Sequence, residues 1–142
     1  MIYLDTSSLL KLFHDEPESA GVRQAVAGES EILVSALARL ESRIQFKAGW
    51  LGGDYGKARY LAYVKALDQL AETDPFRFVE VEAGVFATAL RQVGAAVSLH
   101  VRTLDRLHLA AMEELDVRRL MTNDTTQASA ARGLGWQVVV PG

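Results

Sequence analysis

Four acidic residues have types and positions suited to binding a metal ion: Asp5, Glu41, Asp105 and Asp124. Carboxylates that gather at one place repel one another and take up protons unless a cation lies among them. With oxygen ligands only, the hard ions Mg²⁺ and Mn²⁺ are the expected occupants. Because Mg²⁺ binds phosphate oxygens, lowers the pKa of a bound water and stabilises charge in an in-line displacement, the four residues predict metal-assisted phosphodiester hydrolysis.

The elements that must position these acids follow from short apolar runs alternating with helical patterns. Strands are predicted over residues 2–4, 32–34, 78–81, 119–122 and 137–140. Helices are predicted over 6–14, 18–27, 36–51, 55–72, 83–94, 103–115 and 125–132. This alternation predicts a parallel sheet with helices on both faces. Ligands bind beyond the carboxyl ends of parallel strands, so the four acids are expected at one edge of the sheet.

Glu41 is the most informative of the four. On a helical wheel, Leu37, Leu40, Ile44 and Ala48 form an apolar stripe, and Glu41 falls within it. An unpaired carboxylate on a buried face is costly, so such a group is usually paired or bound to a cation. The alternative to a metal ligand is an internal salt bridge to an arginine.

Each of the other acids also has a structural interpretation. Asp105 would complement the dipole of a helix that Thr103 caps, and Asp124 would cap the last helix with Gln127 as its capping-box partner. Asp5 would likewise cap the helix that follows it. Capping and metal binding can coexist because a carboxylate has two oxygens. No single acid is specific evidence for a metal site, whereas four acids at one edge of the sheet are.

Polar neighbours of the acids are expected to support them. His108 falls on the apolar side of its helix and is expected to be a hydrogen-bonded core histidine rather than a metal ligand. Hydrogen bonds that orient the carboxylates would come from Thr6, Ser7, Thr122 and Asn123.

The sequence resembles the PIN-domain family, and more narrowly the VapC-type toxins of bacterial and archaeal toxin–antitoxin pairs. The resemblance rests on segments 2–7, 35–41, 104–111 and 120–124, which read IYLDTS, SALARLE, LDRLHLAA and LMTND. Their order and spacing span essentially the whole chain. One departure is Asn123, where many relatives carry an apolar or aromatic residue.

The resemblance implies a three-layer α/β/α fold with a central, mostly parallel sheet of four to five strands. It also implies an endoribonuclease that depends on Mg²⁺ or Mn²⁺, inhibition by a small, usually DNA-binding antitoxin protein, and commonly a homodimer. Asp5, Glu41 and Asp105 correspond to the core acids of the family, and Asp124 to a more variable fourth.

Length and composition suit this interpretation. The 142 residues are expected to form one domain, 1–142, and 49% hydrophobic with 23% charged residues is ordinary for a globular protein. There is no cysteine, no recognisable signal peptide and no apolar run near the roughly 20 residues of a membrane span, so a cytoplasmic protein is expected. The net charge of −3 argues against a passive nucleic-acid binder more than against a nuclease.

Other function classes fit less well. A phosphatase of the haloacid dehalogenase type needs a second acid two residues after the first, where Ser7 stands. A receiver domain would show paired acids near its first strand, and a Rossmann dinucleotide-binding domain would show a glycine-rich first turn, which residues 5–8 lack. The non-enzymatic alternative, a PIN-like module that only binds a partner, gives no reason for four costly carboxylates.

Two surface features leave alternatives open. Arg39, Arg43 and Lys47 recur every four residues and would either track an RNA backbone or form a solvated helix face. Aromatic and apolar residues gather around the Gly52-Gly53 turn, some for the core and others for a groove that binds an antitoxin helix or strand. They are Trp50, Leu51, Tyr55, Tyr60 and Tyr63.

Overall fold

A five-stranded parallel sheet forms the centre of the molecule in a computed structural model that describes residues 1–95 and 98–142. Its strands are β1 (Ile2–Leu4), β2 (Ile32–Ser35), β3 (Phe76–Val79), β4 (Arg119–Met121) and β5 (Gln137–Val139). They lie in the order β3-β2-β1-β4-β5, and all four pairings are parallel. The predicted parallel sheet is confirmed, although β3 begins two residues before its predicted start.

Seven helices are found in the described part of the chain. They are α1 (Thr6–Leu10), α2 (Ser19–Ala27), α3 (Ala36–Leu51), α4 (Lys57–Leu70), α5 (Val85–Gly94), α6 (Thr103–Glu114) and α7 (Thr125–Gly133). The largest difference from prediction is α1, which ends at Leu10 rather than residue 14 and continues as a turn. The other helices differ from their predicted bounds by two residues or fewer.

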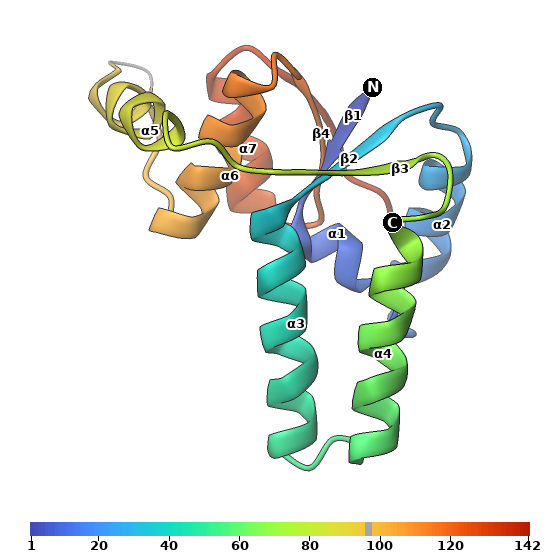
Figure 1. Ribbon diagram of the computed structural model, residues 1–142. Coiled ribbons are helices and arrows are strands. Elements are labelled where there is room, and N and C mark those ends of the chain that lie inside the picture. The colour runs from blue at the N-terminus through green and yellow to red at the C-terminus, as the bar shows by residue number, and fades with distance from the viewer. Residues whose placement is uncertain (96–97) are drawn as a thin grey trace.

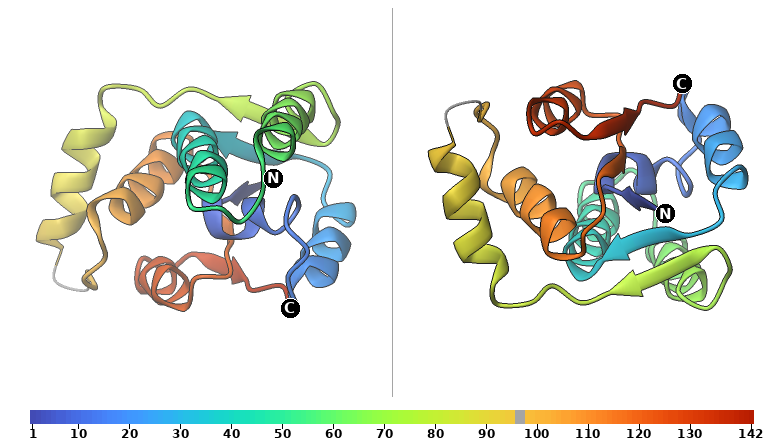
Figure 2. Two further views of the ribbon diagram at one scale, coloured as in Figure 1. Left: turned by 90° about the horizontal axis from the view of Figure 1, so that it is seen from below. Right: turned by 90° about the horizontal axis from the view of Figure 1, so that it is seen from above.

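Two apolar layers cover the two faces of the sheet (Figure 2). Side chains alternate between faces along each strand. Tyr3 therefore packs with buried residues of α5, α6 and α7, whereas Ile2 and Leu4 pack with residues of α1, α2, α3 and α4. This is the three-layer α/β/α arrangement that the family resemblance implies.

Helices α3 and α4 form an antiparallel hairpin that extends away from the sheet (Figure 1). Aromatic rings hold the hairpin together: Trp50 stacks on Tyr60 at 5.1 Å, and Tyr63 stacks on the buried ring of Phe46 at 5.1 Å. Much of the aromatic cluster predicted at this turn therefore packs within the hairpin itself.

The basic residues of α3 differ in their surroundings. Arg39 forms an ion pair with Asp68 of α4 at 2.7 Å, whereas Arg43 and Lys47 are exposed. Among the described residues, none of the helices is both long and apolar enough to cross a membrane.

Candidate active site

The four predicted acids line a single cavity of about 170 Å³, called here the acidic cavity. Its lining residues are Asp5, Thr6, Ser7, Leu10, Glu41, Gln45, Arg102, Asp105, His108 and Asp124. The acids come from four places in the chain: directly after β1, the second turn of α3, the first turn of α6, and the residue before α7. Since β1, β2 and β4 are neighbouring parallel strands, the segments that follow them meet at one edge of the sheet.

Asp5 is the most deeply placed acid, with 4% of its surface exposed. It is the N-cap of α1 and accepts a hydrogen bond from the Ser8 amide at 3.3 Å, as the capping interpretation predicts. Its carboxylate also accepts hydrogen bonds from the hydroxyls of Ser7, at 2.7 Å, and Thr122. Burial raises the pKa of Asp5 because desolvation disfavours the charged form, and these hydrogen bonds oppose that shift only in part.

Glu41 faces the cavity, but the predicted reason for its burial is wrong. Leu40 and Ile44 of the supposed apolar stripe are 57% and 56% exposed, and the buried face of α3 consists of Ala38, Ser42 and Phe46. Because the hairpin extends beyond the sheet (Figure 1), the side that carries Leu40 and Ile44 is only partly covered, with Tyr60 of α4 beside it. Glu41 lies between these faces, with its side chain 21% exposed.

Two side chains from other elements hold the Glu41 carboxylate. Thr6 Oγ1 donates a hydrogen bond to Oε1 at 2.8 Å, and His108 Nε2 lies 2.5 Å from the same oxygen. Burial alone would raise the pKa of Glu41, but the hydrogen bonds and charges of His108, Thr6 and Arg102 lower it below its ordinary value. The partner is a histidine, so the alternative of a salt bridge to an arginine does not describe this site.

His108 is a hydrogen-bonded core histidine, as predicted, and is 2% exposed. Its Nδ1 lies 2.6 Å from the hydroxyl of Tyr3, which donates in turn to Ser35 Oγ at 2.8 Å. These contacts join α6, β1 and the start of α3 behind Glu41. The sequence analysis missed the contact with Glu41, although the spacing of Asp105 and His108 by three residues already placed both on one side of a helix.

Asp105 lines the acidic cavity from the first turn of α6, and its side chain is 17% exposed. Its Oδ2 accepts a hydrogen bond from Arg102 Nε at 3.2 Å, and the Arg102 side chain is 83% exposed. The predicted cap at Thr103 is wrong, because the helix begins one residue earlier than a Thr103 cap requires: Arg102 occupies the cap position and Thr103 is already helical.

Asp124 is the N-cap of α7 and accepts from the amides of Thr126 at 2.9 Å and Gln127 at 3.2 Å. Both bonds end on Oδ1, which leaves the second oxygen available for a cation. The predicted capping box is only half formed. The Gln127 side chain donates to the backbone oxygen of Asp105 at 2.8 Å and thereby ties the start of α7 to α6.

Three of the four predicted orienting residues contact a carboxylate. Thr6 bonds to Glu41, and Ser7 and Thr122 bond to Asp5. Asn123 does not: its amide oxygen accepts from Ser8 Oγ at 2.7 Å and its amide nitrogen donates to the Pro141 carbonyl. Its side chain faces the C-terminal segment because the residue follows β4 on the side of β5.

The donor set of the acidic cavity suits a hard cation. Four carboxylates provide oxygen ligands of the kind that Mg²⁺ and Mn²⁺ prefer. Within residues 1–95 and 98–142, no three His, Asp or Glu side chains are already grouped as a metal site. Glu41 accepts from Thr6 and His108 through Oε1 alone, so its Oε2 can bind an ion while these contacts stay. Asp105 is turned toward Arg102, so binding an ion would draw this carboxylate away from that partner.

The sequence pattern of the PIN domain matches residues 2–133. The chain belongs to the PIN-domain family. This PIN domain is 34% identical to ribonuclease VapC46 of Mycobacterium tuberculosis, over 99% of the chain and 97% of that relative. It is 32% identical to ribonuclease VapC47 of the same organism, over 100% of the chain and 98% of the relative. It is therefore a PIN domain of the VapC type, as the sequence motifs indicate.

Solved structures share the fold of this PIN domain. One is VapC20 of Mycobacterium tuberculosis, a Sarcin-Ricin loop cleaving toxin, with a TM-score of 0.70 and 15% identity over 92% of this chain and 95% of that one. Another is VapBC2 of Rickettsia felis bound to a promoter DNA fragment, with a TM-score of 0.67 and 16% identity over the full length of both chains. The predicted fold class is confirmed.

Proposed function

We propose that this PIN domain is a Mg²⁺-dependent endoribonuclease, with Mn²⁺ as a substitute, and that Asp5, Glu41, Asp105 and Asp124 hold the metal. One observation carries the proposal: carboxylates from four separate parts of the chain line one cavity of about 170 Å³ at the edge of the sheet. The names of its VapC relatives, which are ribonucleases, support RNA as the substrate.

The residues of the site have different roles in such a reaction. When bound, the ion supplies Lewis-acid stabilisation of the phosphate and an activated water. Asp5 and Glu41 present oxygens that Ser7, Thr122, Thr6 and His108 hold in place.

Asp105 and Asp124 complete the set of oxygen ligands that line the cavity. Arg102, once Asp105 turns inward, is free to contact a phosphate of the RNA, because its guanidinium is already exposed beside the acids.

Removal of metal tests the mechanism directly. EDTA should abolish RNA cleavage, and added Mg²⁺ or Mn²⁺ should restore it. The melting temperature should rise with Mn²⁺, because an ion that binds only the folded protein stabilises it. Cleavage that persists in excess chelator would overturn the metal mechanism. Binding of Mn²⁺ without cleavage of any RNA would favour the alternative of a non-catalytic module.

We also propose an inhibitory antitoxin partner, a small DNA-binding protein, since solved structures of the same fold include toxin–antitoxin complexes. A small open reading frame directly upstream should encode it. Co-expression of the two proteins should give a complex in which RNA cleavage is suppressed. Recovery of the PIN domain alone, with unchanged activity, would contradict this partner.

A homodimer is the proposed assembly. Helix α5 exposes Phe86, Leu90 and Val93, which are 62%, 74% and 62% exposed and line an apolar pocket of about 320 Å³ against α6. An apolar patch of this kind favours association. Light scattering during gel filtration should give twice the 15.5 kDa of one chain, and a mass of one chain at micromolar concentration would contradict it.

A further inference from the structure

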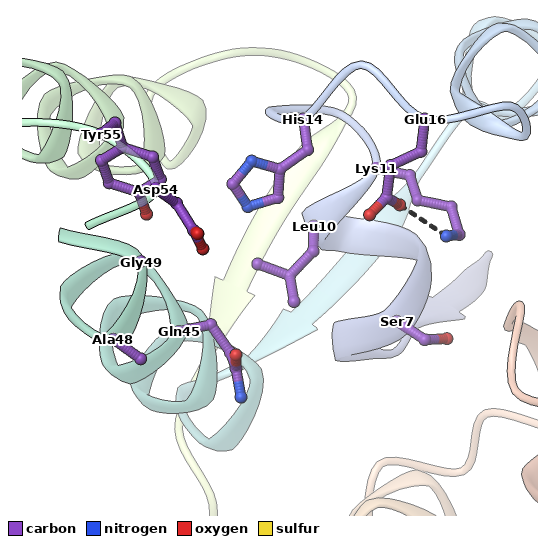
Figure 3. A pocket seen from close by; sticks show the side chains of 10 residues that line it. All are labelled: Ser7, Leu10, Lys11, His14, Glu16, Gln45, Ala48, Gly49, Asp54 and Tyr55. Carbon is purple, nitrogen blue, oxygen red and sulfur yellow. Dashed lines mark hydrogen bonds and ion pairs between the residues drawn. The ribbon is translucent and has the colours of Figure 1, made fainter. Parts of the chain in front are cut away.

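A second cavity adjoins the acidic cavity. It measures about 450 Å³ and lies between the segment that follows α1 and the α3–α4 hairpin (Figure 3); we call it the hairpin cavity. Three residues, Ser7, Leu10 and Gln45, line both cavities. A chain whose phosphate lies among the four acids therefore has a neighbouring space into which the next nucleotide extends.

The charges around the hairpin cavity disfavour a phosphate there. Lys11 is bonded to Glu16 at 2.6 Å (Figure 3). It also lies 3.4 Å from Glu18, so two carboxylates already compensate its charge. Asp54 adds a further carboxylate that points into the cavity from the hairpin turn. A cavity with this excess of acceptor oxygens suits a group that donates hydrogen bonds.

The cavity also offers a flat, partly apolar surface. The imidazole of His14 packs edge-on against Phe46 and Tyr63, at 5.8 Å and 5.0 Å, which fixes the orientation of its ring. Leu10 lies beside it, and the amide of Gln45 points into the space from the opposite side (Figure 3). Ring surfaces for stacking together with amide and carboxylate groups are the means by which proteins bind single unpaired bases.

We propose that the hairpin cavity binds one nucleobase next to the scissile phosphate and prefers guanine. This inference rests on the proposed ribonuclease function and names the part of the RNA that is recognised beside the acids. Guanine presents two adjacent N–H donors, N1–H and the 2-amino group, which match the two oxygens of the Asp54 carboxylate. Cytosine and adenine offer one amino group. Uracil places two carbonyl oxygens beside its single N–H, and these repel a carboxylate.

The test compares short RNAs that differ at one base. Fluorescence anisotropy measures binding of a uridine nonamer, the same RNA with a central guanosine, and the same RNA with a central inosine, which lacks the 2-amino group. Ca²⁺ replaces Mg²⁺, and the series is repeated in EDTA. The guanosine RNA should bind about tenfold more tightly than the inosine RNA, the difference expected for one hydrogen bond to a charged group.

Asp54→Asn should remove this difference, because the amide presents only one acceptor oxygen. The matched control is Asp116→Asn, which changes an exposed acid at the end of α6, where the positive φ of 55° suits asparagine as well as aspartate. The control should keep the full preference. Equal affinity for the three RNAs, or a preference that survives in Asp54→Asn, would overturn the proposal.

Two further outcomes separate this proposal from others. Binding requires no cleavage, so a guanine preference without Mg²⁺-dependent cleavage would refute the proposed function and leave the base cavity standing. Cleavage without any base preference at this position would refute the cavity alone. If Asp54→Asn weakened a complex with a partner protein and left RNA affinity unchanged, the cavity would serve that protein and the proposal would be overturned.

Discussion

The carboxylates of Asp5 and Glu41 are held by side chains from distant segments, and we call them the fold-held pair. The carboxylates of Asp105 and Asp124 are held by groups two or three residues away, and we call them the locally held pair. Thr122 reaches Asp5 from a point 117 residues away in sequence, and His108 reaches Glu41 across 67 residues. Asp105 bonds to Arg102, three residues away, and Asp124 bonds to amides two and three residues ahead. The fold-held pair thus depends on the complete fold, while the locally held pair depends on two helix starts and can adjust.

The largest expected effect comes from Asp5→Asn, which keeps the shape of the Asp5 side chain and removes its charge. RNA cleavage should fall by at least about a hundredfold, the scale for loss of a key catalytic interaction. The pKa of Asp5 is raised in the folded protein, so the ionised carboxylate costs stability at neutral pH, and the variant should melt at the same temperature or higher.

The pH dependence of this difference tests its cause. Protonation relieves the cost of the buried charge, so the advantage of Asp5→Asn should shrink as the pH falls toward the raised pKa. Thermal melts in EDTA between pH 8 and 4 measure it. A variant that melts far below wild type at neutral pH would show that Asp5 is chiefly structural.

Glu41→Gln tests the other member of the fold-held pair. Cleavage should be lost while the protein folds, with a modest decrease in melting temperature because His108 exchanges a carboxylate for an amide. The pKa of Glu41 is lowered in the folded protein, so its contribution is present above the unfolded pKa and is lost as the pH falls through the folded value. The difference in melting temperature should therefore shrink as the pH falls below about 4.3, the ordinary pKa of a glutamate. A difference that stays constant with pH would show that the folded protein does not favour the ionised form of Glu41.

His108→Leu should weaken Mn²⁺ binding by about tenfold to a hundredfold, the range for loss of a residue that orients a metal ligand. It also removes one hydrogen-bond partner from Tyr3, which keeps Ser35, and one from Glu41, which keeps Thr6, so stability should fall as well. His108→Gln, which restores an N–H donor, should recover part of the affinity. Isothermal titration with Mn²⁺ measures both variants, and equal affinities in wild type and His108→Leu would exclude an orienting role.

The smallest effects are expected in the locally held pair. Asp124→Asn keeps a good N-cap, so the free energy of unfolding should stay within about 0.5 kcal/mol of wild type, while Asp124→Ala should cost about 1 kcal/mol. Cleavage should fall in both, by less than in Asp5→Asn. Urea titrations and cleavage rates measure the two effects, and full activity in Asp124→Asn would leave this residue a cap only.

The same contrast explains what could be predicted from the sequence. The strand after which Asp5 stands and the cap at Asp124 follow from local patterns, and both were predicted. Glu41 was placed in the cavity on a mistaken argument: helical spacing identifies an apolar side of α3, but whether that side is covered depends on the hairpin leaving the sheet. The contact of His108 with Glu41 likewise depends on how α6 packs beside α3, which spacing along one helix does not encode.

The hairpin cavity was not foreseen, because its two walls come from segments that have no common pattern. One wall is the turn after α1, which the sequence predicts as a longer helix. The other wall includes the turn between α3 and α4 and becomes part of a cavity only when the hairpin stands beside α1.

Because the hairpin is long, a small rotation at its base displaces its tip much more than its base. Helix α3 has 16 residues, which corresponds to about 24 Å at 1.5 Å per residue. Glu41 lies in the second turn, near the pivot, and Asp54 lies beyond the far end. A tilt of about 5° at the base would displace the tip by about 2 Å on that length and leave Glu41 nearly in place. If the hairpin cavity binds a base as proposed, substitutions along the hairpin would therefore change its preference while the acidic cavity keeps its geometry.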